Sequence, residues 1–124
     1  MNLVDSCGWL EYLADGPNAA FFASAIENTE NLIVPTICIL EVCKRVLQQK
    51  GEDAALQAVA LMQQGVVIDL DSGVAVNAAK VSHEIKLPLA DAVIVATSRI
   101  HRAVIWTQDS DLKGVEGVKF VNKR

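Results

Sequence analysis

The sequence contains few residues that break or loosen a fold, and few that are aromatic. Only 3 of its 124 residues are proline and 7 are glycine, which excludes a collagen-like or linker-dominated chain. Its hydrophobic fraction is 52% against 21% charged, which excludes an intrinsically disordered chain. Aromatic residues make up only 5%, so the core is expected to be aliphatic, as in a buried parallel sheet covered by helices. The composition predicts a globular α/β fold, and the length predicts one domain over residues 1–124.

Cysteine and histidine are too few and too scattered for a disulfide framework or a zinc site. Cys7, Cys38 and Cys43 are an odd number, and no two of them have the C-x-x-C spacing of a metal or redox motif. His83 and His101 lie far from them along the chain. Three reduced thiols suit the cytoplasm, where we expect the protein to reside.

The chain also lacks a recognisable targeting or membrane segment. Residues 1–10 contain no basic leader, and no run approaches the roughly 20 apolar residues that a membrane span needs. We therefore expect no association with a membrane.

Positive charge is scarce, and the first third of the chain has none. Eleven Lys and Arg residues face fifteen Asp and Glu residues, which gives a net charge of −4. Residues 1–43 carry six acidic residues and no Lys or Arg, so their net charge is −6 and that of the remainder is +2. A protein that binds nucleic acid by electrostatic attraction alone is normally basic. Passive coating of nucleic acid is therefore not expected.

Hydrophobic periodicity and turn residues predict alternating strands and helices. Five strands are expected, at residues 2–5, 32–34, 66–70, 103–107 and 118–121. A first helix starts at Asp5-Ser6 and is broken by Asp15-Gly16-Pro17. Five more helices are expected, at residues 17–26, 36–50, 52–64, 71–86 and 88–102. This order is typical of a three-layer α/β/α fold with a central, mainly parallel sheet of four to five strands.

Acidic residues follow the predicted strands, where ligands bind in such sheets. Asp5 ends the first strand, and Glu41 lies in the second turn of the helix after the second strand. Asp109 and Asp111 follow the fourth strand, and Asp91 lies in the first turn of the last predicted helix. We therefore expect these carboxylates to converge on one edge of the sheet.

Every acid except Asp91 also has an ordinary structural explanation. Asp5 could cap a helix, Glu41 could form a surface pair with Arg45, and the segment 107–111 could be an Asx-rich turn. Asp91 differs from the others because it is the only charged residue between positions 87 and 98, in a helix that is otherwise apolar. A carboxylate in such a helix is costly to bury unless a positive charge lies beside it.

Several carboxylates at one edge require a counter-charge, and no His or Cys ligand is predicted near them. Hard divalent cations such as Mg²⁺ and Mn²⁺ prefer oxygen ligands, and Mg²⁺ often completes its shell with water and substrate phosphates. One or two such ions could activate a water molecule and hold a scissile phosphate. The acids therefore predict metal-dependent phosphate chemistry, and bound metal would allow an acidic protein to bind a polyanion.

Four segments resemble those of the PIN-domain family of metal-dependent ribonucleases, in particular the VapC-type toxins of prokaryotic toxin–antitoxin pairs. They are Asp5-Ser6, Ile39-Leu40-Glu41-Val42, Pro88-Leu89-Ala90-Asp91-Ala92-Val93-Ile94-Val95-Ala96-Thr97 and Thr107-Gln108-Asp109-Ser110-Asp111-Leu112. The resemblance spans essentially the whole chain in the family's order. Its strongest part is the Pro-x-x-Asp-Ala-x-Ile run together with the later Thr-x-Asp.

The resemblance implies a PIN-like fold and an endoribonuclease that depends on Mg²⁺ or Mn²⁺. It assigns the metal and the catalysis to an acidic quartet, which consists of Asp5, Glu41, Asp91 and Asp109. Asp111 could share or replace the part of Asp109. Ser6 and Thr107 match positions whose hydroxyls would orient carboxylates and water. The resemblance also implies a homodimer, and an antitoxin whose basic tail enters the acidic groove.

Other interpretations fit the sequence less well or remain open. A receiver-type phosphoacceptor needs an acidic pair before its first-strand Asp, and a haloacid-dehalogenase-like phosphatase needs Asp-x-Asp where this chain has Asp5-Ser6-Cys7. A PIN-like RNA-processing nuclease that is not a toxin and a catalytically silent module that binds a basic peptide both stay open. Six basic residues are candidates for guiding RNA and are equally well explained as surface charges: Lys44, Arg45, Lys80, Lys86, Arg99 and Arg102.

Overall fold

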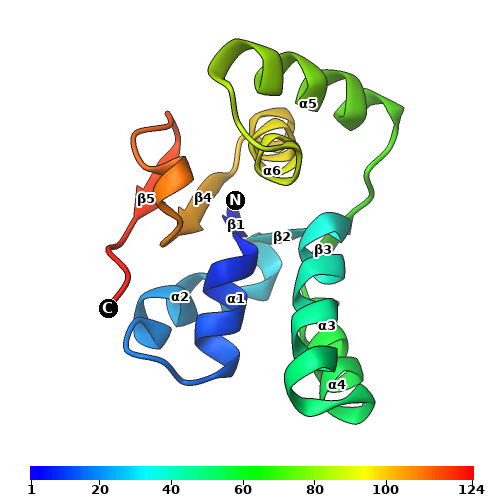
Figure 1. Cartoon of the computed structure of the whole chain (residues 1–124), viewed down its shortest axis with the longest axis vertical. Helices are drawn as coiled ribbons and strands as arrows, with labels where there is room; N and C mark the ends of the chain where they lie inside the picture. Colours follow the sequence, from blue (N-terminus) through cyan, green and yellow to red (C-terminus); the bar gives the residue numbers. More distant parts are fainter.

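The computed structural model describes residues 1–124, and its strands and helices alternate in the predicted order (Figure 1). The strands are β1 (Asn2–Val4), β2 (Leu32–Pro35), β3 (Val66–Ile68), β4 (Val104–Thr107) and β5 (Val118–Phe120). The α-helices are α1 (Ser6–Leu13), α2 (Ala19–Ile26), α3 (Thr36–Lys50), α4 (Glu52–Met62), α5 (Ser72–Ile85) and α6 (Leu89–His101). Two short 3₁₀ helices are η1 (Thr29–Asn31) and η2 (Ser110–Leu112). None of the helices is long and apolar enough to cross a membrane.

The five strands form one sheet in the order β3-β2-β1-β4-β5, and every pairing is parallel. The register of the central pair places Asn2 beside Val104 and Val4 beside Trp106. The chain leaves β1 toward β2 on one side and leaves β4 toward β5 on the other, so the strand order changes direction between β1 and β4. Ligands of open parallel sheets bind at such a point, beyond the carboxyl ends of the strands.

The helices cover both faces of the sheet, which confirms the predicted three-layer α/β/α fold. The helices α5 and α6 lie on one side, and α1 to α4 lie on the other (Figure 1). Because β1 is covered on both faces, Leu3 and Val4 are both fully buried. The expected aliphatic core is also confirmed, since most of its 25 buried residues are Val, Ile, Leu or Ala.

Several element ends differ from those predicted, and side-chain hydrogen bonds account for two of them. The second helix starts at Ala19 and not at Pro17, since the Glu11 carboxylate accepts the Asn18 backbone N–H at 2.7 Å and holds the preceding turn. β3 ends at Ile68 and not at position 70, where the backbone N–H of Leu70 donates to Thr36 Oγ1. α4 ends at Met62, two residues earlier than expected.

Gly8 allows α1 to approach its neighbours closely. A Cβ atom at this position would lie 2.6 Å from two ring carbons of Phe22 and 2.7 Å from Cγ1 of Val4. Both neighbours are fully buried, so neither has free space into which it can move. A side chain at position 8 would therefore push α1 away from β1 and α2.

We predict that Gly8→Ala lowers the free energy of unfolding by about 1–3 kcal/mol, because the added methyl group overpacks a closed core. Urea denaturation measures this change. Gly73→Ala is the matched control, since Gly73 also lies in a helix but its added Cβ would meet only Asp71 Oδ1, at 3.4 Å. The control should gain up to about 1 kcal/mol from helix propensity. Equal losses in the two variants would contradict the steric explanation.

Candidate metal centre

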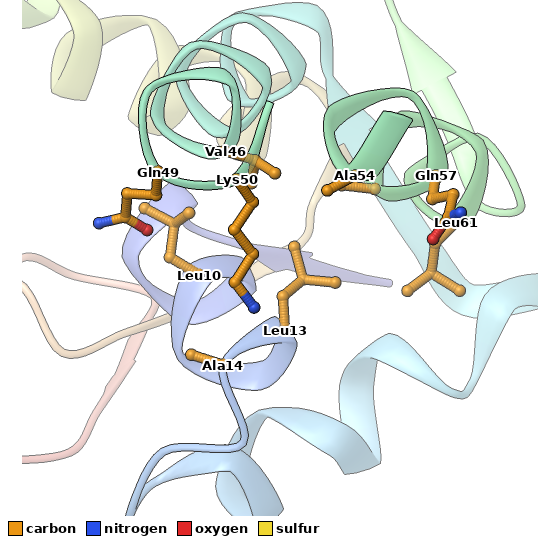
Figure 2. Close-up of a pocket in the computed structure, with 10 residues that line it drawn as sticks. Leu10, Leu13, Ala14, Val46, Gln49, Lys50, Ala54, Gln57 and Leu61 are labelled. Atoms are coloured by element: carbon orange, nitrogen blue, oxygen red, sulfur yellow. The ribbon is translucent and has the colours of Figure 1, made fainter. Parts of the chain in front are cut away.

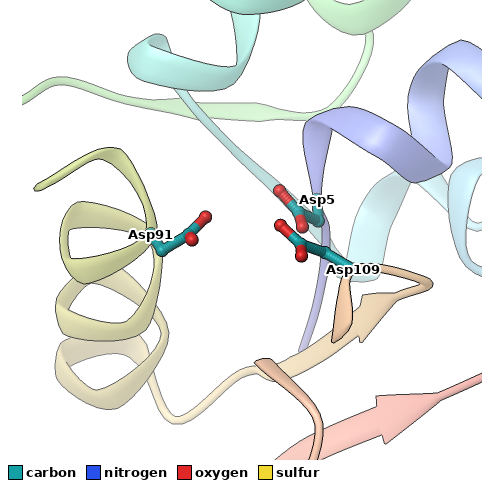
Figure 3. A group of neighbouring side chains, drawn as sticks. All are labelled: Asp5, Asp91 and Asp109. Atoms are coloured by element: carbon teal, nitrogen blue, oxygen red, sulfur yellow. The ribbon is translucent and has the colours of Figure 1, made fainter. Parts of the chain in front are cut away.

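Three of the predicted acids come together at the carboxyl edge of β1 and β4. Asp5 follows β1 directly, Asp109 lies two residues beyond β4, and Asp91 lies in the first turn of α6. One carboxylate oxygen of each residue lies within 4.8 Å of the others. Figure 3 shows the three side chains pointing toward a common space from these three elements. The convergence expected from the sequence is therefore present for these three acids.

The Asp5 carboxylate is held on both of its oxygens. Its Oδ1 accepts the backbone N–H of Ser6 at 2.7 Å, so Asp5 does cap α1. Its Oδ2 accepts the Thr107 hydroxyl at 2.8 Å, across the neighbouring ends of β1 and β4. Asp5 is only 3% exposed. The capping role and a place in the acidic cluster are thus compatible.

Thr107 joins two of the clustered acids. Its hydroxyl donates to Asp5 Oδ2 and accepts the backbone N–H of Asp109 at 2.9 Å. The Asp109 carboxylate in turn accepts the backbone N–H of Asp111 at 2.9 Å, which starts η2. The Asx-type turn predicted from the sequence is confirmed, and the same residue contributes to the cluster.

Glu41 and Asp111 lie outside the group of three close carboxylates. Glu41 is half-buried and accepts the Ser6 hydroxyl at 2.7 Å, whereas Arg45 is exposed. Glu41 is therefore held by Ser6 and not by the surface pair with Arg45 that the sequence suggested. Ser6 links α1 to α3 in this way. Asp111 is exposed on η2.

The cluster is electrostatically unfavourable without a cation. Burial raises the pKa of Asp91, and the charges of Asp109, Asp5, Asp111 and Glu41 add to this shift, so that the pKa rises from 3.8 to about 7. Burial also raises the pKa of Asp5, although its hydrogen bonds from Thr107, Ser6 and Cys7 oppose this shift. Asp91, the single charged residue in an otherwise apolar helix segment, is therefore the acid whose pKa the other four acids raise.

The donor set suits a hard divalent cation. Carboxylate oxygens are the ligands that Mg²⁺ and Mn²⁺ prefer, and one from each of the three acids lies within 4.8 Å of the others. The neighbouring Cys7 does not supply a thiolate, because burial and the charge of Asp5 raise the pKa of its thiol to about 12. The three acids could thus hold Mg²⁺ or Mn²⁺ through oxygen ligands alone.

Cys7 is half-buried beside the cluster, whereas the sequence predicts it only as a reduced thiol. Its Sγ lies 3.5 Å from Asp5 Oδ2 and 3.4 Å from Thr107 Oγ1, so it contacts the residues that shape the cluster. The only feature of the sequence that could have predicted this contact is the position of Cys7 in the first helical turn after Asp5. The six basic residues named as candidates for guiding RNA are all exposed.

A family model described as PIN domain matches residues 3–118, a range that contains all five predicted acids. The chain belongs to the PIN domain family. No curated protein sequence matches this PIN domain.

Solved structures share the PIN fold at low sequence identity. A toxin–antitoxin complex from Klebsiella pneumoniae is 22% identical over 96% of each chain, with a TM-score of 0.80. VapC20 from Mycobacterium tuberculosis, described as a sarcin-ricin loop cleaving toxin, is 17% identical over 99% of this chain and 100% of that one, with a TM-score of 0.79. VapBC2 from Rickettsia felis, bound to a promoter DNA fragment, is 10% identical over 98% and 97%, with a TM-score of 0.75.

We predict that Asp91→Asn stabilises the metal-free protein at neutral and higher pH. The folded wild type keeps the Asp91 proton up to a pKa of about 7, whereas the unfolded chain loses it near the ordinary value of 3.8. Between these values the wild type therefore loses stability as the pH rises, and the neutral Asn does not titrate.

Urea denaturation from pH 4 to pH 8 in the presence of a chelator measures this difference. The stability advantage of Asp91→Asn should be absent near pH 4, grow up to about pH 7 and then stay constant. If the stabilities of the wild type and of Asp91→Asn change in parallel over this pH range, the cluster does not raise the pKa of Asp91.

Proposed function

We propose that this PIN domain is an endoribonuclease that depends on Mg²⁺ or Mn²⁺ and acts as the toxin of a type II toxin–antitoxin pair. Residues 1–124 would form a single nuclease domain. The observation that carries the proposal is the group of Asp5, Asp91 and Asp109, whose carboxylate oxygens lie within 4.8 Å of one another. Membership of the PIN family supports the same chemistry.

The geometry supports different roles for the five acids. Asp5, Asp91 and Asp109 would hold the metal directly, and Asp109 is favoured over Asp111 because Asp111 is exposed and outside the group. Glu41 would complete the acidic quartet from α3, at a position fixed by the Ser6 hydroxyl. Thr107 would keep Asp5 and Asp109 aligned, since its hydroxyl contacts both.

The proposed reaction is hydrolysis of an RNA phosphodiester bond. When bound, a divalent cation supplies an activated water and neutralises charge on the scissile phosphate. The protein's own task is to keep its carboxylates aligned, which the hydrogen bonds of Ser6 and Thr107 achieve for Asp5. RNA as substrate is supported by the description of the similar VapC20 as a sarcin-ricin loop cleaving toxin.

We propose that the partner is an antitoxin with an amphipathic helix and a basic tail. An apolar cavity of about 410 Å³ lies between α1, α3 and α4, and Leu10, Leu13, Val46 and Leu61 are among its lining residues (Figure 2). Amphipathic helices bind in apolar grooves of this kind. A basic tail could then reach the carboxylates, with which an arginine pairs in a bidentate manner.

The cavity and the acids share two helices, which supports a partner that contacts both. Asp5 caps α1, on which Leu10 and Leu13 lie. Glu41 lies on α3, as does Val46. The structures from Klebsiella pneumoniae and Rickettsia felis are described as a toxin–antitoxin complex and as VapBC2.

We also propose that the protein forms a homodimer. Leu89 is 74% exposed and Leu40 is 62% exposed, and each lies within two residues of an acid of the quartet. Apolar surface of this kind is commonly covered in a symmetric dimer.

We predict that the purified protein cleaves single-stranded or loop-containing RNA only when Mg²⁺ or Mn²⁺ is present. Asp91→Asn should lower the cleavage rate by more than about 100-fold, because it removes a ligand charge while preserving the shape of the side chain. Gel-based cleavage assays with circular dichroism as a check on folding measure this effect.

Asp111→Asn is the matched control, since it makes the same chemical change at an exposed acid outside the close group. It should retain most of the activity. Undiminished cleavage in excess EDTA, or in Asp91→Asn, would refute the metal mechanism.

We predict that the protein co-purifies with the product of a neighbouring reading frame and that this partner inhibits cleavage. Leu61→Glu should weaken the complex by at least about 10-fold, because it replaces an apolar side chain that lines the cavity with a charged one. Leu56→Glu is the control, since Leu56 lies on the same helix but is 58% exposed and does not line the cavity.

Both variants should retain the nuclease activity of the free protein. Dissociation constants from calorimetry measure the effect on the complex. Equal binding by the two variants would refute the cavity as the docking site, and cleavage unchanged by the neighbour would refute the toxin assignment while leaving the nuclease intact.

A further inference from the structure

Asn18 is a buried polar residue for which the proposed function has no role. It is 3% exposed and lies directly before α2. Its side-chain amide group donates to Gln108 Oε1 at 2.9 Å and to the backbone carbonyl of Asn122 at 2.9 Å. Its backbone N–H donates to Glu11 Oε2 at 2.7 Å. Asn18 therefore joins α1, the segment after β4 and the C-terminal segment.

The Asn18 side chain does not serve the helix that it precedes. Asparagine is among the residues most favoured at a helix N-cap, where its side-chain oxygen accepts a backbone N–H of the first turn. At Asn18 this capping hydrogen bond is not formed. The side chain is used to bind Gln108 and the C-terminal segment, which indicates a role outside α2.

Gln108 lies between two residues that shape the metal centre. Thr107 before it bonds Asp5, and Asp109 after it contributes a carboxylate to the close group. The Gln108 side chain is 7% exposed. The backbone N–H of Val121 donates to the Thr107 carbonyl at 3.1 Å, so the C-terminal segment also restrains this loop.

The packing of α2 holds Asn18 in a fixed position relative to β4. One turn later in α2, the Phe21 ring packs against Trp106 of β4 with ring centroids 5.1 Å apart. Phe22 is fully buried. Because Phe21 of α2 packs on Trp106 of the strand that leads to Asp109, a hydrogen bond from Asn18 fixes Gln108 with respect to that strand.

We propose that Asn18 is a positioning residue for the metal centre, which acts through Gln108 on the Asp109 carboxylate. This inference rests on the proposed metal site. Partners of metal ligands commonly change metal affinity by about 10–100-fold when they are removed. Asn18 is one residue more remote, so a smaller change is expected.

The test is the dissociation constant for Mn²⁺, measured by calorimetry on the intact protein. Asn18→Ala should raise it by about 3–10-fold, because Gln108 loses its fixed partner. Glu11→Ala is the control, since it removes only the hydrogen bond to the Asn18 backbone and leaves the contact with Gln108. The control should lower the melting temperature and leave the Mn²⁺ dissociation constant within about twofold of the wild type.

Gln108→Ala tests the route and serves if Asn18→Ala does not fold. It should raise the Mn²⁺ dissociation constant to a similar extent, and the double variant should bind no more weakly than the weaker single variant. If the effects of the two substitutions on the Mn²⁺ dissociation constant multiply in the double variant, Asn18 does not act through Gln108. Wild-type affinity in Asn18→Ala would overturn this inference alone, whereas a wild-type protein that binds no Mn²⁺ would refute the proposed function itself.

Discussion

Three carboxylates within 4.8 Å of one another repel, and much of this structure acts to hold them in place. The central link is the hydrogen bond of 2.8 Å from the Thr107 hydroxyl to Asp5. It forms because β1 and β4 are neighbours in register, with Val4 beside Trp106. The buried aliphatic residues of β1 keep that pairing closed on both faces of the sheet. The packing of the core thus supports an arrangement that its charges alone would disfavour.

The acids of the site come from both helix layers and from the sheet between them. Asp91 comes from α6 on one face, Glu41 comes from α3 on the other, and Asp5 and Asp109 come from the strand ends. The raised pKa of Asp91 reflects this convergence, since burial and all four other acids contribute to it. A change in the packing of either helix layer would therefore alter the electrostatics of the site.

The order of the strands and helices could be predicted from the sequence, and so could the place of Asp91 in the site. Both depend on local sequence patterns. Periodicity identifies each strand and helix, and Asp91 is distinctive as the one charge in an apolar helix. Asp5 shows that the capping and cluster interpretations need not compete, since it caps α1 through Oδ1 and also belongs to the close group of carboxylates. The hydrogen bond from Ser6 to Glu41 and the side-chain hydrogen bonds of Asn18 could not be predicted, because they join residues 35 to 104 positions apart. The closeness of α1 to Phe22 at Gly8 depends likewise on tertiary packing.

The placement of β1 in the centre of the sheet has a consequence for how the protein is made. β1 is synthesised first, yet one of its two neighbours, β4, follows about a hundred residues later, and the Thr107 to Asp5 hydrogen bond spans 102 positions. Such long-range pairing is slow to form and depends on late segments of the chain. A nascent chain on the ribosome therefore has no assembled acidic cluster until β4 and the segment up to Asp109 have emerged. For the proposed endoribonuclease, this order of assembly would delay activity until translation of its own message has passed these segments.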